Sequence, residues 1–166
     1  MAAGSTYTPL ATTTVAVASS TLAFTSISGS YTDLVLVINA ANSVGNQDVY
    51  IQFNSDTGAN YSRTVLRGNG STAVSARTTG ATSAYLTSAS GTSTTSLEFN
   101  SITSIQNYSN ATTYKTALTR SNTAQYATEA IVNLWRSTAA ITRIDVTSTG
   151  LFSAGSTFTL YGIAAA

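Results

Sequence analysis

The 166-residue sequence contains no cysteine and no histidine. Without cysteine there is no disulfide framework and no thiolate metal site, and without histidine the commonest general base and zinc ligand are missing. Charged residues make up only 8% of the chain, against about 25% in an average soluble domain. Because the net charge is +1, the chain has no strongly basic surface, and neither nucleic acid nor an anionic membrane is expected as a partner.

Long apolar runs are also missing, and a secretory leader is not expected. No apolar run approaches the roughly 18 residues that would span a bilayer. The first ten residues, MAAGSTYTPL, have neither the basic region nor the apolar region of a signal peptide. We therefore expect synthesis in the cytoplasm. The single proline, Pro9, excludes a proline-rich linker.

Apolar residues, by contrast, make up 43% of the chain, the usual share for a folded protein. They alternate with polar residues in most segments, and a period of two predicts strands with one face on a core. Strands are expected near residues 6–17, 22–26, 31–39, 48–54, 62–67, 97–106, 113–119, 127–136, 141–147 and 156–163. No segment has the pattern of a helix. We expect an all-β protein, a single-domain antiparallel β-sandwich of jelly-roll type that spans residues 1–166.

Two segments lie outside this pattern. Residues 1–6 are expected to form a flexible N-terminal segment. Residues 68–96 contain, beyond alanine, only Val74, Tyr85 and Leu86 as apolar residues, and we expect a long exposed loop or hairpin excursion there. Loops of that length usually have a function or are disordered.

The stretch FNSDTGANYS, residues 53–62, concentrates oxygen-bearing side chains and leaves three interpretations open. Asn54, Asp56 and Asn60 loosely match the spacing of a calcium loop, although tight calcium sites use more than one carboxylate. Asp56 and Asn60 beside the aromatic ring of Tyr61 would suit a sugar. The favoured interpretation is a turn, because Asn, Asp and Gly bond their own backbone and tolerate left-handed geometry.

The stretch AIVNLWRS supplies candidate contact residues. Strand alternation places Ile131 and Trp135 on one face, opposite the alternate residues Ala130, Val132 and Leu134. Trp135 either covers one end of the second sheet or joins Ile131 and Arg136 in anchoring a partner, since Trp and Arg concentrate binding energy at interfaces. Tyr85 and Leu86, in the expected excursion, are further interface candidates.

Catalytic residues and cofactors are not expected. Without histidine, the only amine bases for a hydroxyl nucleophile are Lys115 and the N-terminus. A glycosidase needs two carboxylates about 5 to 10 Å apart. The six acidic residues are scattered along the chain, as Asp33, Asp48, Asp56, Glu98, Glu129 and Asp145. An enzyme is therefore not the expected function.

Six stretches, in order along the chain from residue 7 to residue 163, carry a resemblance to a known group of proteins. They are YTPLATTTV, FTSISGSYTDLVLVI, IQFNSDTGANYSRTVLRGNG, SIQNYSNATTYKTALTR, VNLWRSTAAITRIDV and FSAGSTFTLYGI. Together they resemble the small β-rich structural proteins of tailed bacteriophages. The resemblance implies a β-sandwich and a place in the virion, as a head decoration, neck or tail component.

The combined expectation is a non-enzymatic virion protein, made in the bacterial cytoplasm, that decorates or cements the outer surface of the capsid. Its partners would be the major capsid protein or other virion proteins. We expect a homo-oligomer, a trimer or a dimer. A β-sandwich with so few charged residues exposes sheet faces and strand edges that another copy of the chain can cover. A tail or neck appendage and a carbohydrate-binding module for host surface glycans are the alternatives.

Overall fold

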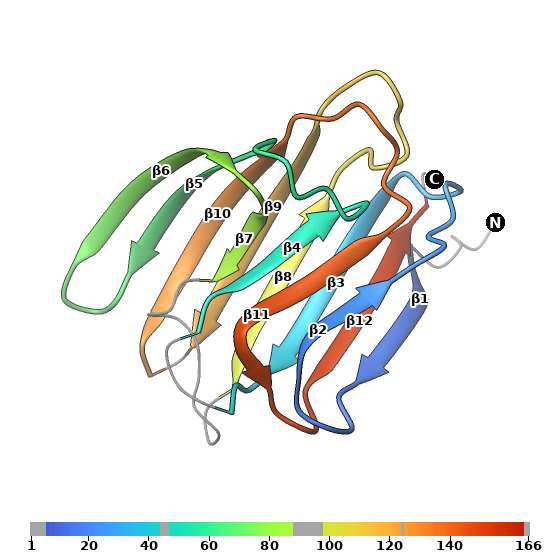
Figure 1. Cartoon of the computed structure of the whole chain (residues 1–166). Helices are drawn as coiled ribbons and strands as arrows, with labels where there is room; N and C mark the ends of the chain where they lie inside the picture. Colours follow the sequence, from blue (N-terminus) through green and yellow to red (C-terminus); the bar gives the residue numbers. More distant parts are fainter. Residues whose placement is uncertain (1–5, 44–46, 88–97, 124, 165–166) are drawn as a thin grey trace.

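The computed structural model describes residues 6–43, 47–87, 98–123 and 125–164. Within these ranges the chain forms strands and no helix (Figure 1). The strands are β1 (Tyr7–Thr14), β2 (Ser19–Phe24), β3 (Asp33–Ala40), β4 (Val49–Phe53), β5 (Tyr61–Gly68), β6 (Ala73–Ala81), β7 (Ala84–Thr87), β8 (Phe99–Ile105), β9 (Lys115–Thr123), β10 (Ala127–Trp135), β11 (Ile144–Phe152) and β12 (Thr157–Ile163).

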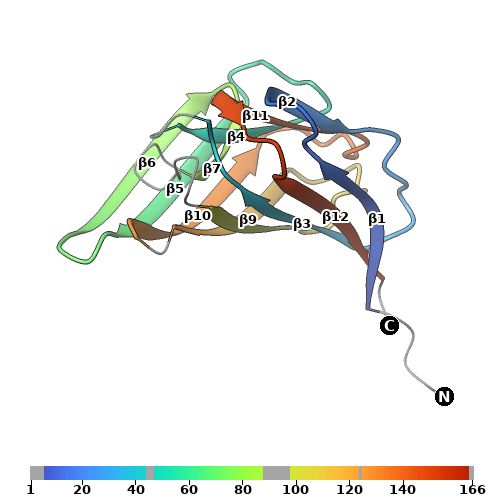
Figure 2. The same cartoon turned by 90° about the horizontal axis from the view of Figure 1, so that it is seen from below.

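The strands form two antiparallel sheets that pack face to face (Figure 2). The large sheet has eight strands in the order β1-β12-β3-β8-β9-β10-β5-β6, and the small sheet has four in the order β2-β11-β4-β7. This confirms the all-β class and the antiparallel sandwich that the period of two predicts.

The connections are those of a jelly roll with two inserted hairpins. Four strands of the large sheet, β1-β12-β3-β8, and the small sheet have the strand orders of the two sheets of a jelly roll, and the chain crosses between them as two Greek keys do. The hairpin β9–β10 follows β8, and the hairpin β5–β6 lies between β4 and β7. Both hairpins add to the same edge of the large sheet, so β5 and β6 extend past the small sheet (Figures 1 and 2).

The core lies between the inner faces of the two sheets. Alternate residues of the central strands point into it, because successive side chains on a strand point to opposite faces. Fully buried members include Leu34, Leu36 and Ile38 of β3, Val49, Ile51 and Phe53 of β4, and Phe158 and Leu160 of β12.

The inner face of β8, β9 and β10 is partly polar. Beside β7, its buried residues include Thr103, Thr119, Glu129 and Asn133. They bond to one another or to β7: the hydroxyls of Thr103 and Thr119 lie 2.9 Å apart, and Thr87 donates to Glu129 at 3.0 Å. Hydrogen bonds of this kind offset the cost of removing the polar groups from water.

Asn133 joins the two sheets through its side-chain amide. Its Oδ1 accepts from the backbone N–H of Tyr85 at 2.8 Å, and its Nδ2 donates to the carbonyl of Tyr85 at 2.9 Å. Strand β7 is an edge of the small sheet and pairs with β4. The amide of Asn133 therefore satisfies backbone groups of β7 that a neighbouring strand would otherwise bind.

The segment 68–96 differs from the exposed excursion that the sequence predicts. Strand β6 is exposed along nearly its whole length, as expected for a hairpin. Strand β7, in contrast, is buried at all four positions and completes the small sheet. The strands on either side of this segment agree with the expected ones to within a few residues. Residues 88–96, like residues 1–5 of the expected N-terminal segment, lie outside the described residues.

Candidate functional site

The loop after β4 opens with a tight left-handed turn. Asn54 and Ser55 have φ of 52° and 56°, and the backbone N–H of Asp56 donates to the carbonyl of Phe53 at 3.0 Å. Positive φ at both central residues is the geometry of a type I′ turn, and asparagine tolerates it better than most residues.

Asn54 ties this turn to the segment that leads into β11. Its side-chain Oδ1 accepts from the backbone N–H groups of Thr142 at 2.9 Å and Arg143 at 3.1 Å. Its Nδ2 donates to the carbonyl of Ala140 at 2.8 Å. The amide is thus fully used in holding two loops together.

Asp56 is the centre of the loop. Its Oδ1 accepts from the backbone N–H of Gly58 at 2.8 Å, which forms an Asx turn. Its Oδ2 accepts from the Asn60 amide at 2.9 Å and from the Trp135 indole N–H at 2.6 Å. The hydrogen bond from each of these donors is stronger when the acceptor is a charged carboxylate.

These contacts do not fit the calcium interpretation. A cation needs free oxygen lone pairs, whereas Asn54 and Asp56 direct their oxygens at N–H groups, whose positive ends repel a cation. In the described ranges there is no group of three or more Asp or Glu side chains that could share a metal ion. The residues instead form the shaped turn that the sequence favours.

The sugar interpretation needs an exposed aromatic face, and the structure buries Tyr61 completely. The ring packs against Phe53 and Trp135, with centroid distances of 6.3 Å to each. Its hydroxyl accepts from the backbone N–H of Phe53 at 3.0 Å, and burial raises the pKa of the phenol. Tyr61 therefore cannot stack on a sugar, and Asp56 and Asn60 bond to each other in the half-buried loop.

The interface candidates on β10 and β7 are in the interior, so the hypothesis that they anchor a partner is wrong. Ile131 and Leu86 are fully buried, and Trp135 and Tyr85 are 2% and 6% exposed. Strand alternation on β10 is as expected, but its Ile131 side faces the small sheet. Trp135 covers the end of the core, packing against Phe53 at a centroid distance of 5.5 Å.

Arg136 stays partly exposed, but its guanidinium braces the loop. It donates to the carbonyl of Ala59 at 2.8 Å and to the hydroxyl of Ser62 at 3.2 Å. Its backbone N–H donates to the carbonyl of Asn60 at 2.8 Å. These bonds give Arg136 a structural role at the junction of β10 and the loop.

Lys115, the only lysine, is 1% exposed. Its ammonium donates to the carbonyls of Thr113 at 2.7 Å and Thr138 at 3.2 Å, and burial lowers its pKa. Both contacts are to backbone carbonyls, so Lys115 joins two loops and has the bonding pattern of a structural residue.

Two carboxylates at this end of the molecule should make its stability depend on pH. Burial acts to raise the pKa of Asp56, but the bonds from Trp135, Asn60 and Gly58 outweigh it and lower the pKa overall. The Arg143 guanidinium, 2.6 Å from Asp145, lowers the pKa of that carboxyl. Asp145 also accepts from the hydroxyl of Ser55 at 3.1 Å, so both acids stabilise the same loop.

A carboxyl with a lowered pKa stabilises the folded state above its unfolded pKa, about 4, and that contribution is lost as the pH falls through the folded pKa. We therefore expect the free energy of unfolding, measured in urea, to be level between about pH 5 and 7 and to decline below about pH 4. The double variant Asp56→Asn, Asp145→Asn should be less stable at pH 7 and should show a smaller decline. Equal declines in the two proteins would contradict this assignment.

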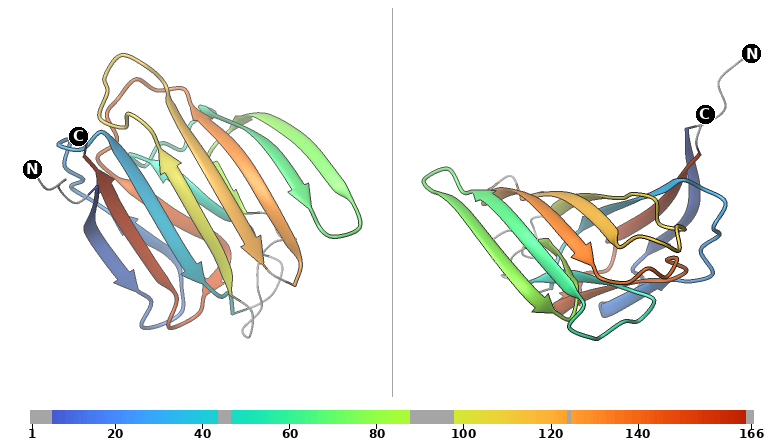
Figure 3. Two further views of the ribbon diagram at one scale, coloured as in Figure 1. Left: turned by 180° about the vertical axis from the view of Figure 1, so that it is seen from behind. Right: turned by 90° about the horizontal axis from the view of Figure 1, so that it is seen from above.

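The outer face of the large sheet offers a surface for contacts (Figure 3, left). Four large apolar side chains from neighbouring strands are exposed there by 39 to 59%, and together they form what we name the outer apolar patch: Ile102, Leu118, Val132 and Leu66. Leu118 lies directly across from Val132 in the β9–β10 register. None of these four residues is among the contact residues that the sequence predicts. The signal that could have found them is that both faces of β10 carry large apolar side chains, Val132 and Leu134 on one face and Ile131 and Trp135 on the other.

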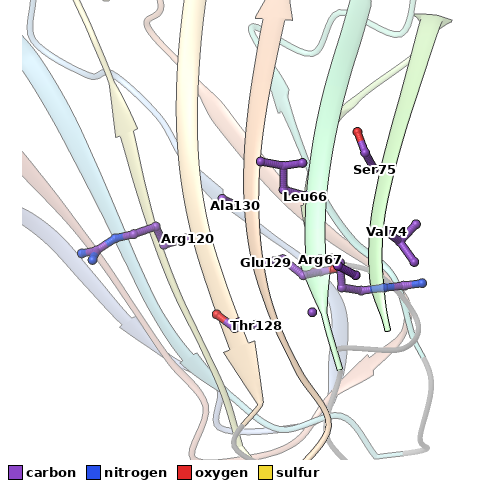
Figure 4. Close-up of a pocket in the computed structure, with 10 residues that line it drawn as sticks. Leu66, Arg67, Val74, Ser75, Arg120, Thr128, Glu129 and Ala130 are labelled. Atoms are coloured by element: carbon purple, nitrogen blue, oxygen red, sulfur yellow. The ribbon is translucent and has the colours of Figure 1, made fainter. Parts of the chain in front are cut away.

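Beside this patch the twisted sheet forms an open hollow of about 590 Å³ between β9, β10, β5 and β6 (Figure 4). Leu66, Ala73 and Ala130 contribute its apolar lining, and Arg120 lies at its border on β9. Figure 4 shows the Arg120 side chain extending from β9 toward the side of β8. The volume of the hollow is in the range of small-ligand pockets, but the hollow is open to solvent like a surface groove.

The chain matches no protein-family model, and searches of curated proteins and of solved structures find no significant match.

Proposed function

We propose that the chain is a non-enzymatic structural protein of a tailed-bacteriophage virion, which decorates or cements the outer surface of the capsid. The outer apolar patch carries the proposal, because side chains such as Leu118 and Val132 are exposed on a rigid sheet, where contact with another protein would bury them. The six stretches between residues 7 and 163 that resemble structural proteins of tailed bacteriophages indicate the class of partner, another protein of the virion. The jelly roll is compatible with it, since viral capsid proteins use this fold among others.

The chemistry of the described residues supports a binding role over a catalytic one. Asp56 and Asp145 are held by structural bonds, Glu129 is buried beside β7, and Lys115 is bonded to carbonyls. Glu129 and Asp145 each accept from a hydroxyl, that of Thr87 and that of Ser55. Glu129 is buried, however, and Asp145 is ion-paired with Arg143, so neither is placed as the general base that nucleophilic catalysis requires. A capsid lattice presents many copies of the partner. Contacts that are weak for each copy can therefore still hold the protein to the particle through avidity.

The test is the protein content of purified particles of the phage that encodes the chain. For a capsid decoration protein, quantitative mass spectrometry should find it in copy numbers comparable with those of the major capsid protein. A few copies per particle would indicate the neck or tail alternative instead. Absence from purified particles, with the protein present in the infected cell, would contradict any virion role.

A further inference from the structure

We infer that the outer apolar patch is the docking face of the chain, and that it binds a protein surface on which carboxylates stand among apolar side chains. This inference rests on the proposed virion function and names the surface and the partner chemistry that the function requires.

The outer face has the composition of an interface. The outward positions of β8, β9, β10, β5 and β6 place the outer apolar patch in the middle. Along one side runs a row of amide and hydroxyl side chains on consecutive strands, Asn39, Asn100, Asn122 and Thr128. An apolar centre with a polar rim is the usual anatomy of a protein–protein interface.

The charge of the outer face is positive. Arg120 on β9 and Arg77 on β6 are the only charged residues at the outward positions of these five strands. Both are exposed, and neither side chain has a hydrogen bond or ion pair anywhere in the part of the chain that the structure describes. Glu129, the acid of β10, is buried on the opposite face. Two unpaired guanidinium groups on an apolar surface are complementary to carboxylates, which arginine binds through two parallel hydrogen bonds.

Charge also disfavours a second copy of the chain on this face. A copy would bring its own Arg120 and Arg77 and no carboxylate to meet them. Nucleic acid is a poor match as well, because affinity for it grows with the number of phosphates neutralised and two cations are few. The pattern fits an apolar, acidic protein surface best.

The outer apolar patch is small. Even the twelve outward positions around it, three on each of four strands, cover only on the order of 400 Å², since strands lie about 4.8 Å apart and outward residues about 7 Å apart. A stable pair of proteins buries about 800 Å² on each partner. The patch alone is therefore too small for a tight one-to-one complex, and it suits a protein that is held at many equivalent positions.

The hollow beside the patch gives the interface a specific feature. Its apolar lining is Leu66, Ala73 and Ala130, with Arg120 at its border (Figure 4). An apolar side chain of the partner can enter the hollow while a neighbouring carboxylate meets Arg120. Anchors of this kind dominate binding energy in most interfaces.

The test measures binding of the purified chain to particles of the encoding phage that were grown without it. We expect Arg120→Glu to weaken binding by about ten-fold or more, Arg120→Lys to weaken it less, and Val132→Ser to weaken it several-fold. Val17→Ser is the matched control, because Val17 is 80% exposed in the β1–β2 connection, away from the patch, and it should bind normally. Circular dichroism and the urea midpoint confirm that each variant is folded; Arg120 is exposed, so its replacement leaves the core intact.

If both Arg120→Glu and Val132→Ser bind normally, the outer apolar patch is not the docking face, although the proposed virion function is not contradicted. Failure of the unaltered protein to bind any particle would overturn the virion function and this assignment with it. A dimer in sedimentation that Val132→Ser abolishes would show that a second copy occupies the face, which also overturns the partner named here.

Discussion

Asn133→Ala is expected to lower the free energy of unfolding by about 4 kcal/mol, because it leaves two backbone groups of β7 unsatisfied and each such buried group costs about 1 to 3 kcal/mol. Asn133 is 1% exposed, and its amide bonds both the N–H and the carbonyl of Tyr85. Water cannot replace the lost amide easily, since Tyr85 itself is 6% exposed. Urea unfolding followed by tryptophan fluorescence would measure the change.

The matched control for this prediction is Asn122→Ala. Asn122 is an exposed asparagine on the outer side of β9, and the same substitution there should change stability by less than about 0.5 kcal/mol. Similar effects at the two positions would contradict a special role for Asn133. Asn133→Asp should also destabilise, because it removes the donor to the Tyr85 carbonyl and places a charge in the interior.

Trp135→Ala is expected to destabilise the protein by about 4 kcal/mol, the cost of deleting a buried tryptophan from a packed core. The ring is 2% exposed, packs on Phe53 and Tyr61, and donates to Asp56 at 2.6 Å. Trp135→Phe keeps most of the packing but removes the indole N–H donor. It should therefore lower the free energy of unfolding by about 2 kcal/mol, the contribution of a hydrogen bond to a charged group. Chemical denaturation at pH 7, followed by circular dichroism, gives both values.

A double-mutant cycle isolates the bond between Trp135 and Asp56. If the indole N–H stabilises the loop through that carboxylate, Trp135→Phe and Asp56→Ala should be non-additive, with a coupling of about 1.5 kcal/mol or more. Additive effects would show that the two residues act independently and that packing alone explains the burial of the tryptophan.

Much of the fold could be predicted from the sequence because its strands border a core on one side only. Val49, Ile51 and Phe53 alternate with Tyr50 and Gln52, and this contrast marks β4 without any knowledge of its neighbours. The turn after β4 is equally local, since the residues Asn54 and Asp56 supply both the left-handed geometry and the bonds that fix it.

Strands β6 and β7 lack that local contrast. Strand β6 is exposed on nearly every residue, so its sequence AVSARTTGA has no buried side to show a period. Strand β7 is four residues long and buried throughout, so AYLT has no exposed side. Their positions depend on pairing with β5 and β4, which a single sequence does not display.

The sequence predicts partner contacts on the wrong side of β10 for a related reason. On β10, the Ile131 side also carries Glu129 and Asn133, whereas the Val132 side is apolar except for Thr128. Polarity alone therefore favours burial of the wrong side. The buried acid and amide are tolerated because Thr87 and Tyr85 bond to them, and those partners are more than forty residues away in sequence.

The central claim, that the chain is a decoration protein held to a capsid by the outer face of its large sheet, is tested most directly by a cryo-electron microscopy reconstruction of the virion. The account predicts jelly-roll density on the outer capsid surface, with β9 and β10 turned toward the capsid protein and a carboxylate of that protein beside Arg120. Density elsewhere in the particle, or a chain whose outer apolar patch faces solvent, would contradict it.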